Sequence, residues 1–97
     1  MKTFINIQNK LRAHKSEIEQ KFHISAISIF GSYVRGEEKT ESDIDVLVSF
    51  SEPVSLFKFL DLEEYLTDLL GIKVDLVSKK ALKPHIGERI LKEAVAV

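Results

Sequence analysis

The sequence contains no cysteine, which excludes disulfide bonds and thiolate metal sites. It also has no long hydrophobic run, because its apolar stretches are only a few residues long and about twenty are needed to cross a bilayer. Neither sign of charge predominates, since 14 basic and 15 acidic side chains give a net charge of -1. No nucleic-acid partner is therefore implied, and we expect a cytoplasmic protein without a membrane anchor.

The chain is too short for two hydrophobic cores, so residues 1–97 are expected to form a single domain. Hydrophobic residues make up 44% of the sequence and charged residues 30%, which is typical of a globular protein. There is no internal repeat, low-complexity segment or linker that would mark a domain boundary.

Hydrophobic spacing predicts alternating helices and strands. Helical spacing covers residues 3–22, 55–70 and 86–94, and β-branched runs cover residues 26–30, 43–50 and 72–77. The apolar stripe of the middle helix is expected to lie in the core rather than at an interface, with Phe57 and Tyr65 as the residues to check for exposure. The expected fold class is α/β (α+β), a small mixed three-stranded sheet with helices packed on it.

Two carboxylates lie close together at the start of the second predicted strand. Side chains two residues apart on a strand point the same way, so Asp43 and Asp45 share one face. Oxygen ligands of this kind suit Mg²⁺, which usually takes one or two protein carboxylates and completes its shell with water and phosphate oxygens. The pair therefore predicts a magnesium site.

A third carboxylate follows from the connection between strands. The helix over residues 55–70 is long enough to bring the chain back along the sheet, so the strand that contains Asp75 should run parallel to the Asp45 strand. Asp75 and Asp45 both lie near a strand start, which places them at the same sheet edge. Asp75 is expected to be a third metal ligand or a general base.

The turn after the first predicted strand has the residues of a phosphate-binding loop. Gly31 allows close approach of the backbone, and the Ser32 hydroxyl and the amides of a short helix that follows would donate to β- and γ-phosphate oxygens. Arg35 would neutralise the leaving pyrophosphate, although a solvated side chain is an equally good interpretation. An antiparallel first strand would bring this turn to the carboxylates.

Gly31 and Ser32, ten intervening residues and then Asp43-Ile44-Asp45 occur in the stretch GSYVRGEEKTESDIDVLV. This pattern resembles the signature of the DNA polymerase beta-like nucleotidyltransferase superfamily. The short chain, Arg35-Gly36 and the later strand with Asp75 are similar to its minimal nucleotidyltransferase branch, the antitoxins encoded beside HEPN-domain toxins.

The resemblance implies the polymerase beta-like fold and a role for five residues. Gly31 and Ser32 would hold the triphosphate, while Asp43, Asp45 and Asp75 would ligate Mg²⁺, two ions in all. It further implies transfer of AMP from ATP to a tyrosine of a partner HEPN toxin, which is thereby silenced.

Other interpretations stay open at this point. An Asp-x-Asp pair alone is often a turn followed by a strand, with Ser42 and Asp43 capping backbone amides. The chain could be a non-catalytic antitoxin that neutralises its toxin by binding, or a small-molecule (antibiotic) nucleotidyltransferase. The three aspartates favour an enzyme over a binding scaffold, because clustered carboxylates repel one another when no metal is bound.

Overall fold

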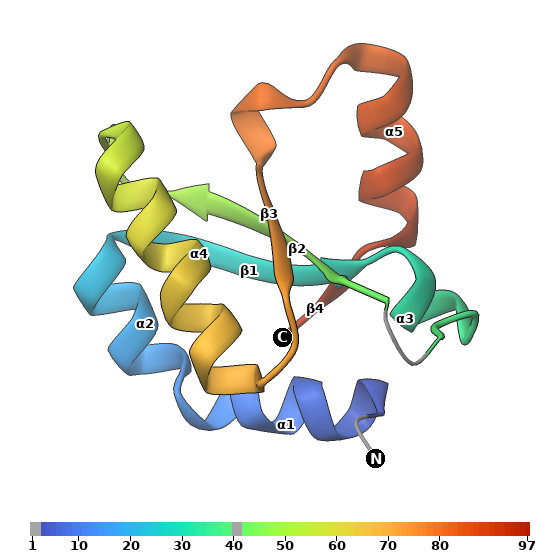
Figure 1. The fold of residues 1–97 in the computed structure, drawn as a ribbon. Helices are drawn as coiled ribbons and strands as arrows, with labels where there is room; N and C mark the ends of the chain where they lie inside the picture. Colours follow the sequence, from blue (N-terminus) through green and yellow to red (C-terminus); the bar gives the residue numbers. More distant parts are fainter. Residues whose placement is uncertain (1–2, 40–41) are drawn as a thin grey trace.

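The computed structural model describes residues 3–39 and 42–97, which form helices on a mixed four-stranded sheet (Figure 1). The helices are α1 (Phe4–Ala13), α2 (Lys15–Phe22), α3 (Ser32–Arg35), α4 (Leu56–Leu70), the 3₁₀ helix η1 (Lys79–Ala81) and α5 (Pro84–Glu93). The strands are β1 (Ile24–Phe30), β2 (Ile44–Phe50), β3 (Val74–Ser78) and β4 (Val95–Ala96). Every helix of this part of the chain is too short or too polar to cross a lipid bilayer.

The sheet has the strand order β3-β2-β1-β4. Strand β3 runs parallel to β2, as the sequence predicts, and β1 runs antiparallel to β2, a pairing that the sequence allows. The expected class is confirmed, but the expected number of three strands is wrong, because β4 pairs with β1 through Ser28↔Ala96 and Ile29↔Val95. A strand of two residues is too short to show the alternating pattern by which strands are recognised in a sequence.

The first helical segment is not the single helix predicted over residues 3–22. It breaks at His14, whose backbone has φ -106° and ψ 6° and whose Nδ1 lies 3.0 Å from the carbonyl oxygen of Lys10. A straight helix of that length would extend about 30 Å, whereas a seven-residue strand extends about 23 Å. The break keeps both halves on the sheet, so that Leu11 of α1 and Ile18 of α2 are both fully buried.

Helices α1, α2 and α4 pack on one face of the sheet, and α5 lies apart from them (Figure 1). On β2, the residues Ile44, Val46 and Val48 are fully buried in this core. Strand residues alternate between the two faces, so Asp45 points to the opposite face. The hydrophobic core thus fixes the side of the sheet on which the acidic residues lie.

Helix α4 is only partly the core helix that its apolar stripe predicts. Leu62, Leu66 and Leu70 are buried, but its first turn leaves Leu56, Phe57 and Leu60 exposed by 69%, 80% and 47%. Tyr65 is half-buried, with its ring 5.4 Å from that of Phe22, and so does not join Phe57 in one exposed patch. The first turn is exposed because α4 begins after the loop over residues 51–55, beyond the end of β2.

Candidate active site

The parallel pairing of β2 and β3 brings two of the three aspartates into register. Asp45 is directly opposite Asp75 at the edge where both strands begin. Neighbouring strands lie about 4.8 Å apart, so the two side chains point to the same face within reach of one ion. Asp43 precedes β2 by one residue and is exposed, as is Asp75.

The electrostatics of Asp45 indicate that the three carboxylates interact. Burial is the main cause that raises the pKa of Asp45 to about 6, and the charges of Asp75 and then Asp43 raise it further. Arg35 acts in the opposite direction, and Glu93 adds a smaller repulsion. A carboxylate surrounded in this way has an unfavourable charge that a cation would compensate.

Gly31 lies against the Asp45 carboxylate. It has φ +83°, and a Cβ atom built at this position would overlap Asp45 Oδ2 and lie 2.9 Å from Asp45 Cγ. Only glycine leaves room for that side chain, and its backbone conformation is also one that other residues rarely adopt. The turn after β1 and the acidic edge of β2 therefore meet at this contact, because Phe30 pairs with Asp45 in the antiparallel ladder.

Ser32 begins the short helix α3 directly after Gly31. The amides of Val34 and Arg35 both donate to the Gly31 carbonyl, at 3.1 and 3.2 Å. Gly36 closes the helix in the left-handed conformation, and its amide donates to the Ser32 carbonyl. The structure thus places the Gly31-Ser32 turn beside the aspartates, as the antiparallel pairing predicts.

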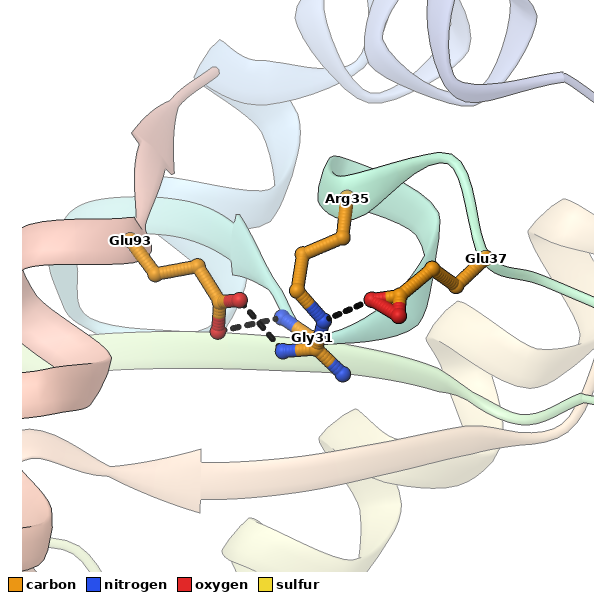
Figure 2. A network of polar contacts seen from close by, with 4 residues as sticks. All are labelled: Gly31, Arg35, Glu37 and Glu93. Atoms are coloured by element: carbon orange, nitrogen blue, oxygen red, sulfur yellow. Dashed lines mark hydrogen bonds and ion pairs between the residues drawn. The ribbon is translucent and has the colours of Figure 1, made fainter.

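Arg35 is held by two carboxylates of the chain (Figure 2). Its Nε donates to Glu37 Oε1 at 2.7 Å, and its Nη1 donates to Glu93 Oε1. The hydrogen bonds that the guanidinium donates to Glu93 and then to Glu37 are the main causes that raise its pKa. In this arrangement its charge is already matched, so a role at the pyrophosphate would require that some of these bonds be exchanged.

The acidic residues fit a magnesium ion in chemistry. The pKa of Asp45 is raised by burial and then by its acidic neighbours, and all of the candidate ligands offer hard oxygen atoms. Within residues 3–39 and 42–97, however, no three acidic or histidine side chains already converge on one point as a finished metal site. Asp43 and Asp75 are exposed, so small side-chain rotations would be needed to complete the site.

Helix α5 lines the site as well, which the sequence analysis did not predict. A cavity of about 270 Å³ contains Gly31, Arg35 and Asp45 and is closed by four residues of this helix, namely Ile86, Arg89, Ile90 and Glu93. Their spacing of three, four and seven residues places them on one helical face. That spacing was visible in the sequence, but nothing local indicated that this face would meet residues about forty to sixty positions earlier.

A larger groove of about 690 Å³ lies far from the aspartates, at the end of the sheet where β2 and β3 finish. Its lining includes Phe50, Leu56 and Phe59, together with Lys79 and Lys80. It contains none of the residues predicted to act in catalysis or in nucleotide binding. We therefore take the smaller cavity beside Asp45 as the candidate active site.

Comparison with known proteins shows the family to which the sequence is similar. The family model described as "Nucleotidyltransferase domain" matches residues 11–97. Protein adenylyltransferase MntA of Thermococcus cleftensis is 52% identical over 97 residues, which cover 100% of this chain and 98% of the relative. The predicted resemblance to minimal nucleotidyltransferases is thus confirmed.

Solved structures show the same fold. One provisionally named minimal nucleotidyltransferase has a TM-score of 0.76 and 34% identity, with 93% of this chain and 95% of that chain covered. Another is a complex of a tri-AMPylated HEPN toxin of Shewanella oneidensis with an MNT antitoxin, with a TM-score of 0.68 and 18% identity. The match covers 93% of this chain and 70% of that one, and at this identity it shows likeness of fold alone.

Proposed function

The chain belongs to the nucleotidyltransferase domain family, and on that premise we propose that it transfers AMP from ATP to a tyrosine of a partner HEPN-domain protein. The observation that carries the proposal is the register of Asp45 with Asp75, next to Asp43 and the Gly31-Ser32 turn. A triphosphate and a divalent cation are the ligands that this combination of acidic and hydrogen-bond-donating groups fits best.

The residues of the chain would divide the reaction between them. The Ser32 hydroxyl and the turn at Gly31 would hold the β- and γ-phosphates, so that the α-phosphorus lies near the acidic edge. Asp75 would accept the proton of the acceptor hydroxyl while the oxygen of that hydroxyl attacks the α-phosphorus. The bond to the β-phosphate oxygen breaks, and the products are the AMP ester of the tyrosine and pyrophosphate.

The three aspartates would hold Mg²⁺, as a pair of ions in our proposal. When bound, the metal neutralises the triphosphate and lowers the pKa of the attacking hydroxyl. The metal would stabilise the charge of Asp45 most, since this carboxylate is partly buried and faces two other carboxylates. Removal of divalent cations should therefore abolish the reaction.

The acceptor is proposed from the relatives. The Thermococcus protein is named a protein adenylyltransferase, and its match covers the whole length of this chain. The Shewanella complex pairs an MNT antitoxin with an AMP-modified HEPN toxin. We propose the same kind of partner here, and the chain would act as the antitoxin of that pair.

The experiment uses ATP labelled at either the α- or the γ-phosphate. The purified chain is incubated with Mg²⁺ and a candidate HEPN-domain toxin, and label on that protein is measured. We expect transfer of the α-label only, with none in the Asp43→Asn variant. Transfer of the γ-label would indicate a kinase instead. If no label transfers and Asp43→Asn still neutralises the toxin, the chain acts by binding alone.

A further inference from the structure

The Glu93 carboxylate joins both ends of helix α3 (Figure 2). Its Oε2 accepts a hydrogen bond from the Gly31 amide at 3.1 Å, and its Oε1 accepts one from Arg35 Nη1. Gly31 is the residue before α3, and Arg35 is its last residue. One side chain of α5 therefore forms hydrogen bonds at both ends of the turn.

Helix α3 needs such support because it is only four residues long. A helix this short does not persist by itself, since the entropy lost in its first turn exceeds the gain from its few hydrogen bonds. Gly31 also has no side chain that could cap the helix, and as a glycine its backbone can adopt many conformations besides the observed φ +83°. The contacts of Glu93 are external bonds that compensate for both weaknesses.

The bond between Glu93 and Gly31 also bears on Asp45. Gly31 touches the Asp45 carboxylate so closely that a Cβ atom would not fit. A shift of Gly31 would therefore change the space available to Asp45. Glu93 thus contacts the phosphate-binding turn directly, and through Gly31 it is one residue removed from the acidic edge.

Glu93 is itself held firmly in place. It ends α5, and two residues later Val95 begins the pairing of β4 with β1. Burial raises the pKa of Glu93, but the hydrogen bonds from Arg35 and Gly31 outweigh that effect, so the net pKa is lowered. A charged carboxylate on a fixed backbone is well suited to orient the groups that it binds.

We propose that Glu93 is a positioning residue, which fixes Gly31 and Arg35 in the geometry that receives the triphosphate. This inference rests on the proposed function, because it assumes that ATP binds at the Gly31-Ser32 turn. It adds helix α5 to the functional part of the molecule.

The test compares Glu93→Ala and Glu93→Gln with the control Glu88→Gln, which makes the same change at an exposed position of α5. The dissociation constant of ATP is measured with Mg²⁺ and no acceptor. We expect it to rise about tenfold in Glu93→Ala, because both bonds to a charged group are lost. Glu93→Gln can still accept from the Gly31 amide, so about a threefold rise is expected. The control should match the wild type.

Steady-state kinetics separate positioning from a general loss of structure. In Glu93→Gln the KM for ATP should rise while the KM for the acceptor stays unchanged. In an Arg35→Ala background, the same Glu93 substitution should have a smaller effect, because one of its two partners is already missing. Equal effects on both substrates, or full additivity with Arg35→Ala, would overturn the proposal.

The remaining outcomes distinguish this inference from the proposed function. If the wild type binds ATP and Glu93→Ala binds it equally well, the role of Glu93 is refuted and the proposed function stands. Tighter binding by Glu93→Gln would also refute it, since the carboxylate would then compete with phosphate. If the wild type binds no ATP, the proposed function itself fails. Should Glu93→Ala not fold, the near-isosteric Glu93→Gln decides.

Discussion

At the scale of single residues, the role proposed for Asp45 as a metal ligand comes at a cost in stability. Its carboxylate is partly buried, faces two other carboxylates and has a pKa raised to about 6. At neutral pH it is therefore charged in an environment that disfavours the charge. Active sites commonly retain such groups at a cost in stability.

The first prediction concerns Asp45→Asn, which removes that charge with little change of shape. In the absence of divalent cations at pH 7, the free energy of unfolding should increase. Solvent screens this partly exposed group, so we expect a gain of about 1 kcal/mol rather than the full value of the pKa shift. Urea unfolding measures the gain, and a destabilised Asp45→Asn variant would contradict the account.

The pH dependence of that gain follows from the direction of the shift. The folded protein binds the Asp45 proton more tightly than the unfolded chain, so this residue favours folding below its ordinary pKa of 3.8. That contribution is lost as the pH rises through about 6. The difference in the free energy of unfolding between Asp45→Asn and the wild type should therefore be largest above pH 6 and vanish near pH 4.

The second prediction uses two glycines with positive φ. Gly31→Ala combines a strained backbone with a clash against Asp45. We therefore expect the free energy of unfolding to fall by about 3 kcal/mol and the transfer activity to be lost. Gly36→Ala has φ +71° but nothing within 4 Å of its new Cβ, so a loss of about 1 kcal/mol is expected. Thermal unfolding compares the pair, and equal losses would mean that the contact with Asp45 is unimportant.

The residues of the site differ in how far the sequence could predict them. Asp43, Asp45 and Asp75 follow from strand alternation and from the parallel return of the chain, which are local rules. Glu93 lies 62 residues from Gly31, and no local pattern connects the two. Such a contact depends on where α5 docks, which hydrophobic spacing does not specify.

At the scale of elements, the C-terminal segment has more influence than its length suggests. Strand β4 pairs with β1, Val97 is buried, and its amide donates to the Ile27 carbonyl at 3.0 Å. The segment follows α5 directly, so it also fixes the helix that carries Glu93. The helix break at His14 and this strand are the elements that propensity did not predict, because tertiary packing determines both.

The third prediction is that deletion of residues 95–97 destabilises the protein. Loss of the β4 ladder and of the buried Val97 side chain should lower the free energy of unfolding by about 3 kcal/mol. Val97→Ala keeps the ladder and should cost about 1 kcal/mol. ATP binding should weaken in the deletion and persist in Val97→Ala. A deletion variant that binds ATP normally would show that α5 does not depend on β4.

At the scale of the whole molecule, the two ends of the sheet have different chemistry. The candidate active site lies where β2 and β3 begin, and the exposed first turn of α4 borders the groove at the other end. The strand directions that create this division were predictable, because a helical return makes the last pairing parallel. The exposure of Leu56 and Phe57 was not, since an apolar stripe has the same appearance whether or not another element covers it.

The central claim is tested most directly by the intact mass of the HEPN-domain protein after incubation with the chain, ATP and Mg²⁺. We predict a mass increase of one or more AMP groups, located on tyrosine by peptide sequencing. The increase should be absent with Asp43→Asn or Asp45→Asn and when divalent cations are chelated. An unchanged mass with the wild-type chain, under conditions in which it binds both ATP and the partner, would contradict the account.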